Sequence, residues 1–177
     1  LRRLRLGKFV VSQEGAALLF GAGAAPRLEE LSFSALAAGA VVPALAEARR
    51  NVPRLRALRL DREEGDELDD EPGELAAQAA LARAIAALAT SGLRLQDLTL
   101  PSLDNAGAAA LVDATCVPRS LQIGDGSAGL RSLVAPWQGL RELRVAFSDM
   151  HDERLTERLL CANLHSLTVL DVGHWSE

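Results

Sequence analysis

A short leucine pattern recurs along the chain, and its spacing constrains the fold more than any other feature. The pattern L-x-x-L-x-L first occurs at residues 1–6, and the next two copies follow at intervals of 27 residues. The fourth copy comes after 40 residues, which is the same interval lengthened by thirteen. The seven copies, of which the fifth is shortened and starts with a proline, begin at Leu1, Leu28, Leu55, Leu95, Pro118, Leu140 and Leu167. Internal repetition at this period is typical of chains built by stacking similar units.

The spacing within each copy predicts a short β-strand. In L-x-L the two leucines lie on one side of an extended chain, and the residue between them lies on the other side. The segments between the copies have helical spacing, most clearly in Glu74–Thr90, where Leu81, Ile85 and Leu88 share one stripe and Arg83 faces away. Further helices are expected at residues 14–21, 35–50, 105–114 and 152–162. Strands that alternate with helices in this way must be parallel, and the units must stack to bury their leucines.

These residues resemble the leucine-rich-repeat superfamily. Residues 1–6, followed by Gly15 and Leu19, are similar to the ribonuclease-inhibitor-like repeats, whereas residues 24–33, 51–60 and 161–172 look more like the cysteine-containing repeats of F-box substrate receptors. The Asn that usually closes the turn after the strand is replaced in three repeats, by Phe9, Leu36 and Leu103. The resemblance implies an α/β fold, namely a curved right-handed solenoid with a parallel sheet on the concave face and helices on the convex face. It also implies protein recognition rather than catalysis, so the chain is expected to be an interaction module or a scaffold subunit of a larger assembly.

The length of 177 residues allows one hydrophobic core, so a single domain over residues 1–177 is expected. Leucine and alanine account for 64 of these residues and aromatic residues for only 3%, which predicts an aliphatic core. The net charge of −5 comes from residues 61–73, which hold eight of the 24 acidic residues, and the remainder is slightly basic. This acidic segment is interpreted as an insertion in the third repeat. It is expected to be a solvated loop, or alternatively an electrostatic contact for a basic partner.

Both ends of the sequence fall within or next to a repeat, with no polar capping unit, which predicts a fragment of a longer chain or a contact with flanking repeats or domains. Cys116 and Cys161 lack the spacing of a metal site or a disulfide framework and are expected to be reduced and buried. The uncharged stretch 31–46 is too short to span a bilayer, and no signal peptide is recognisable. We therefore expect an intracellular, most simply cytoplasmic, protein without a membrane partner.

The residues between the leucines would line the concave face and are the candidates for partner binding. Their charges alternate in sign along the array, with no aromatic side chain among them. A polyphosphate would require a continuous basic field, so another protein is the expected partner and nucleic acid is not. The candidate binding residues are Arg3, Arg5, Glu30, Arg59, Asp97, Gln122 and Arg144. Arginine is the strongest of these candidates because it is enriched at the energetic centres of protein interfaces.

Two alternative functions remain open. The resemblance to F-box receptors would make the chain the substrate-recognition part of a ubiquitin ligase. The residues from Gly124 to Gly129 read G-x-G-x-x-G after a strand-like segment, which is the form of a dinucleotide-binding motif. The strand before this motif is too polar for a central parallel strand, so its glycines are interpreted as a tight turn. His151, His165 and His174 show no ligand spacing, and no nucleophile motif occurs, so no enzymatic activity, cofactor or metal is expected.

Overall fold

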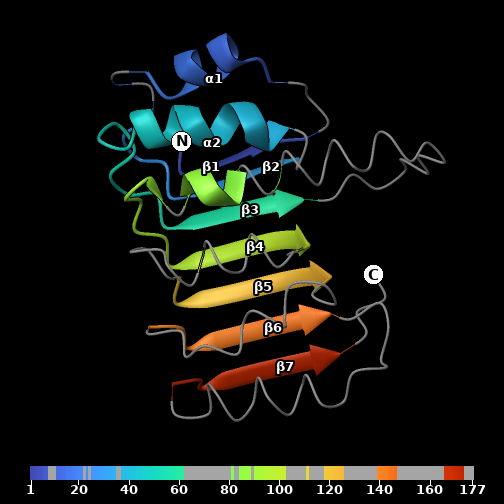
Figure 1. Ribbon diagram of the computed structural model, residues 1–177. Helices are drawn as coiled ribbons and strands as arrows, with labels where there is room; N and C mark the ends of the chain where they lie inside the picture. Colours follow the sequence, from blue (N-terminus) through green and yellow to red (C-terminus); the bar gives the residue numbers. More distant parts are fainter. Residues whose placement is uncertain are drawn as a thin grey trace, which may run out of the picture.

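The structure is a computed structural model of the whole chain (Figure 1). The residues that it describes are 1–7, 11–21, 23, 25–34, 37–61, 81, 84–88, 90–102, 111, 118–125, 139–146 and 166–173.

Seven strands form one parallel sheet whose spatial order is the same as the order in the sequence. Figure 1 shows the strands stacked one below another, all pointing in the same direction. The strands are β1 (Arg3–Leu6), β2 (Glu30–Ser34), β3 (Ala57–Asp61), β4 (Asp97–Ser102), β5 (Ser120–Asp125), β6 (Glu142–Ala146) and β7 (Val169–Gly173). The prediction of an α/β fold with a parallel sheet is therefore confirmed, and every strand coincides with one copy of the leucine pattern.

Equivalent leucines of successive copies lie next to one another across the sheet. A single row crosses all seven strands and consists of Leu4, Leu31, Leu58, Leu98, Leu121, Leu143 and Leu170. A second aliphatic or aromatic position follows two residues later, with Phe33 beside Leu6 and Leu60. In the five central strands these positions are almost completely buried, while the residues between them are exposed or half-buried. The alternation predicted from L-x-L is thus present.

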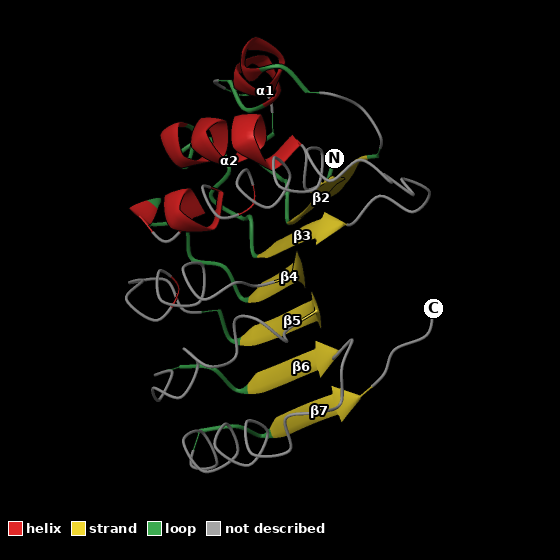
Figure 2. Ribbon diagram, turned by 45° about the vertical axis from the view of Figure 1, so that its right-hand side comes forward, coloured by secondary structure: helices red, strands yellow, loops and turns green. Residues whose placement is uncertain are grey.

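Two helices cover the buried side of the first strands (Figure 2). Helix α1 (Gln13–Leu19) is capped by Ser12, whose Oγ accepts a hydrogen bond from the Gly15 amide at 3.1 Å. Helix α2 (Ala38–Glu47) is shorter than the expected helix and contains Pro43. Phe20 and Leu45 pack with the leucines of the strands in one continuous core. Within the described part of the chain, no helix is both long enough and apolar enough to cross a membrane.

The third expected helix is described in part. Residues 84–88 are helical, and Leu81, Ile85 and Leu88 are all buried, as the stripe in the sequence predicts. Arg83 lies outside the described residues. The expected helix at 152–162 also lies outside them, and so does the one at 105–114 except for one helical residue, Leu111.

The strands begin through one repeated hydrogen-bonding arrangement. The carbonyl oxygen of the residue before a strand accepts hydrogen bonds from two consecutive amides at the start of the next strand. The Arg2 oxygen, for example, accepts from Glu29 at 2.8 Å and from Glu30 at 3.0 Å. The carbonyls of Glu29, Arg56, Arg119 and Arg141 do the same for β3, β4, β6 and β7. These backbone hydrogen bonds hold the starts of β2, β3, β4, β6 and β7 in the register of the preceding strand.

The first residue of the expected acidic insertion lies in a strand. Asp61 is the last residue of β3 and lies beside Ser34 in the sheet. It therefore belongs to the strand, while the rest of the expected insertion, residues 62–73, lies outside the described residues.

Gly124 also differs from expectation. It was interpreted as part of a tight turn, but it lies within β5. A Cβ atom at this position would lie 2.7 Å from the carbonyl oxygen of Pro101 in β4. Close approach of two backbones thus accounts for this first glycine of the G-x-G-x-x-G motif, and Gly126–Gly129 lie outside the described residues.

Replacing Gly124 with alanine should destabilise the fold, because the added methyl group forces β4 and β5 apart. We expect Gly124→Ala to lower the free energy of unfolding by about 1–3 kcal/mol, the range for overpacked sites. Urea denaturation followed by circular dichroism measures this. Gly39→Ala is the matched control, since Gly39 lies in α2 with nothing near its Cβ position. This control should be neutral or stabilise the protein by up to about 1 kcal/mol, and equal effects of the two changes would contradict the packing argument.

Candidate interaction surface

The residues between the leucines share one face of the sheet, which we call the polar face. They form two rows across the seven strands. The first row contains Arg3, Glu30, Ala57, Asp97, Ser120, Glu142 and Val169, and the second contains Arg5, Ser32, Arg59, Thr99, Gln122, Arg144 and Asp171. All seven candidate residues from the sequence lie in these two rows. The structure thus places them on a common surface, although they come from strands up to 141 residues apart.

The first part of the polar face, on β1–β3, is internally compensated. Asp61 is at its centre: the Arg59 guanidinium forms an ion pair with this carboxylate, and the Ser32 hydroxyl donates to its Oδ2 at 2.6 Å. The Arg5 Nη2 lies 3.7 Å from the same oxygen. In the first row, the Arg3 Nε lies 3.0 Å from a Glu30 carboxylate oxygen. Four of the candidate residues, Arg3, Arg5, Glu30 and Arg59, are therefore engaged in ion pairs on this face.

Asp61 was not among the candidates from the sequence, because its position at the start of an acidic run assigned it to the insertion. The alternation of residues between the two faces of β3 could have identified it. Asp61 follows Leu60 as Arg59 follows Leu58, so it falls on the polar face.

A second compensated group lies at the edge of the sheet where the first strands begin. Glu29 accepts from Arg56 at 3.2 Å and lies 3.8 Å from the Arg2 Nε. These three residues immediately precede β2, β3 and β1, so the pairing follows from the register of the sheet. Exposed pairs of this kind contribute little to stability.

Removing the charge of Asp61 should weaken the fold more than removing another charge on the same face. The Asp61 side chain is 21% exposed, and it interacts with two arginines and one hydroxyl. We expect Asp61→Asn to lower the free energy of unfolding by about 1 kcal/mol. Glu30→Gln is the control, because Glu30 pairs with a single arginine that is 79% exposed, and it should change stability by less than about 0.5 kcal/mol. Chemical denaturation measures the free energy of unfolding of both variants. An Asp61→Asn protein as stable as the wild type would contradict the stabilising role of Asp61.

The second part of the polar face, on β4–β6, is different. Asp97, Gln122 and Arg144 are exposed, and none of them forms an ion pair or side-chain hydrogen bond with another described residue. Arg144 lies beside Gln122 and Asp171 in the register, yet no ion pair joins it to either described neighbour. A carboxylate, an amide and a guanidinium group are thus exposed to solvent on three neighbouring strands.

The three histidines and both cysteines lie outside the described residues. They are His151, His165, His174, Cys116 and Cys161. Among the described residues, no group of three or more His, Cys, Asp or Glu side chains is arranged to hold a metal ion.

Comparison with models of known protein families gives no match, and a search among curated proteins finds none of significant sequence similarity. The resemblance to leucine-rich repeats therefore rests on the residues quoted for it above.

Proposed function

We propose that the protein is a non-catalytic protein-interaction module that binds its partner through the polar face. The observation that carries this proposal is the contrast between the two parts of that face. On β1–β3 the charges are paired with one another, whereas on β4–β6 Asp97, Gln122 and Arg144 are exposed and unpaired among the described residues. A partner gains most from groups whose hydrogen-bonding capacity is not already used. We therefore assign recognition to the second part.

The sheet provides a suitable base for recognition. Neighbouring strands lie about 4.8 Å apart, and the backbone hydrogen bonds fix that spacing. Side chains on such a scaffold bind at a lower entropic cost than side chains on a loop that must be ordered first. Arg144 is the expected anchor, since arginine can bind a partner carboxylate through two parallel hydrogen bonds.

We further propose that the chain is a single leucine-rich-repeat solenoid in which the polar face is concave. The sequential order of the strands and the continuous leucine row support this arrangement. Curvature of the stack would direct the free groups of β4–β6 toward a common partner. Solenoid proteins use extended surfaces of this kind for binding.

Exchanging the two free charges of the second part should disrupt recognition. The double variant Asp97→Lys with Arg144→Glu keeps the net charge of the chain and touches no described ion pair. Affinity purification with quantitative mass spectrometry, from extracts of the cells that produce the protein, measures which proteins the full chain retains. We expect the recovery of the specific partner to fall by about tenfold or more, because unlike pairs become like pairs across the interface.

The matched control exchanges a compensated pair instead. Arg3→Glu with Glu30→Arg also conserves net charge and restores the ion pair in the opposite orientation. This variant should retain the same partner at near wild-type recovery. Thermal unfolding of both variants verifies that they are folded. If both retain every partner of the wild-type protein, the polar face does not carry the function.

A further inference from the structure

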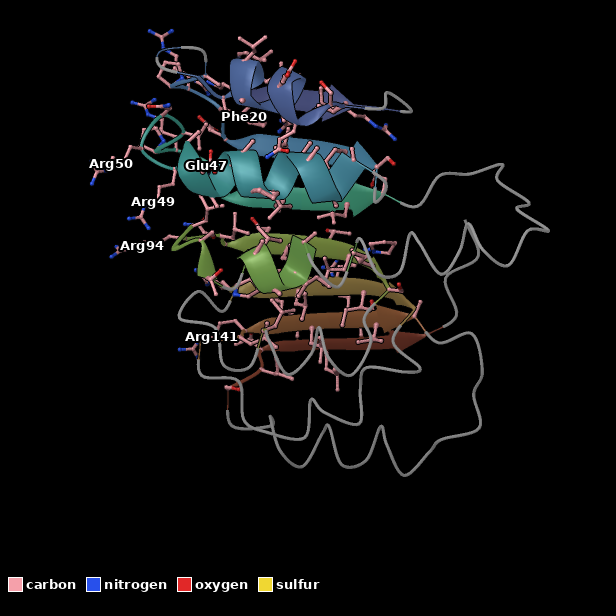
Figure 3. The ribbon with its side chains drawn as sticks, turned by 45° about the horizontal axis from the view of Figure 1, so that its top comes forward. Phe20, Glu47, Arg49, Arg50, Arg94 and Arg141 are labelled. Carbon is pink, nitrogen blue, oxygen red and sulfur yellow. The ribbon has the colours of Figure 1, made fainter. Side chains whose placement is uncertain are left out.

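A row of arginines lies along the edge of the sheet where the strands begin, away from the polar face. Six of them, which we call the arginine edge, occupy the described segments that lead into β3–β6: Arg49, Arg50, Arg54, Arg94, Arg119 and Arg141. All six are exposed. Figure 3 shows Arg49, Arg50, Arg94 and Arg141 projecting on the same side of the molecule, although they come from three different turns.

Direct contacts join two pairs of successive turns. The Arg49 Nη1 in the turn before β3 donates to the Ser91 carbonyl in the turn before β4 at 3.2 Å, and the Arg141 Nη1 donates to the Ser166 carbonyl in the turn before β7 at 3.4 Å. Gly92 allows the first of these contacts, because a Cβ at this position would lie 2.8 Å from the Arg49 Nη1. The turns of each pair therefore lie side by side, as their strands do.

The positive charge of the edge is almost uncompensated. In the described turns from the end of α2 to the start of β7, the single acidic residue is Glu47, and it forms no ion pair with a described residue. Arg50, Arg54, Arg94 and Arg119 form neither ion pairs nor side-chain hydrogen bonds within the described part of the chain. Four guanidinium groups are thus available to a partner.

We propose that the arginine edge binds an extended acidic segment of a partner protein. From the turn before β3 to the turn before β6 the edge spans about 14 Å, given a strand spacing of about 4.8 Å. In an extended peptide, alternate residues lie on one side, so three carboxylates at alternate positions span about 13 Å. The spacing of the guanidinium groups therefore suits an acidic peptide that runs across the ends of the strands, with each carboxylate accepting from an arginine.

A protein segment fits the edge better than a nucleic acid. Stacking platforms for bases require aromatic side chains, and the described turns from α2 to β7 contain none.

Asp61, the last residue of β3, does not neutralise the edge. It lies about 13 Å from the beginning of the strand, because four intervals of about 3.3 Å separate it from Ala57. Electrostatic interactions in solution are screened over about 8 Å at physiological ionic strength. Asp61 also forms ion pairs with Arg5 and Arg59, so its charge acts on the polar face.

The test uses the full chain and a fluorescein-labelled peptide of alternating Glu and Gly, with a peptide of alternating Gln and Gly as the uncharged probe. Fluorescence anisotropy at low salt should show binding of the Glu peptide only. The triple variant Arg50→Glu, Arg94→Glu and Arg119→Glu removes no described contact, and it should bind about 30-fold more weakly, since three attractions become repulsions. Raising sodium chloride from about 50 to about 300 mM should weaken wild-type binding by about tenfold.

The matched control places the same three reversals on the paired part of the polar face, as Arg3→Glu, Arg5→Glu and Arg59→Glu, and thermal unfolding verifies that it is folded. It has the same net charge as the edge variant and should retain binding within about threefold of wild type. Equal losses in the two variants would show that net charge alone attracts the peptide, and absence of wild-type binding would also overturn the proposal.

A labelled oligothymidine of equal length serves as the nucleic-acid probe, and tighter binding of it than of the Glu peptide would overturn the assignment to a protein segment. Sedimentation velocity tests self-association, and an edge-dependent dimer would identify a second copy of the chain as the occupant instead.

Discussion

Burial of the leucine row on one side of the sheet is the constraint on which the other features of the structure depend. Side chains along a strand alternate between the two faces, so a slip of one residue in any strand would expose its leucines and bury its charges. The leucine row runs unbroken from Leu4 to Leu170, and each strand therefore has one allowed position beside its neighbour. The carbonyls that accept two amides at the start of the next strand reinforce the same register from the backbone.

The same constraint determines which charges meet on the polar face. With the register fixed, Arg3 must lie beside Glu30, and Asp61 must lie near Ser32 and Arg59. Pairing on β1–β3 is thus a consequence of which residues occupy equivalent positions in adjacent repeats. On β4–β6 the equivalent positions hold residues that do not complement each other as ion pairs, and their polar groups stay exposed. One repeated scaffold therefore carries a compensated surface and an uncompensated one.

The leucine spacing was sufficient to predict the strands, their parallel order and the residues of the polar face, because each follows from a period of two within a longer repeat. It was insufficient where local sequence is ambiguous. Asp61 is the first residue of an acidic run and also continues the alternation of β3. Its pairing with Ser34 in the sheet assigns it to the strand. The sequence around Gly124 is typical of a turn. A glycine is needed there because the backbone of Pro101, on β4, leaves no room for a Cβ atom. The leucine spacing does not predict the arginine edge, because the arginines precede the strands at unequal distances and no alignment of the leucine pattern places them together.

The polar face and the arginine edge differ in the kind of recognition they can support. The long exposed arginines at the strand beginnings act through a field that salt screens, and such charges mainly raise the rate of association. Side chains held in the middle of strands have fixed positions and contribute mainly to specificity and to the lifetime of a complex. Because both surfaces belong to the same strands, their relative placement is set by the leucine rows and does not require ordering on binding. The two surfaces share no residue, and this separation allows charge reversals of equal size to tell them apart.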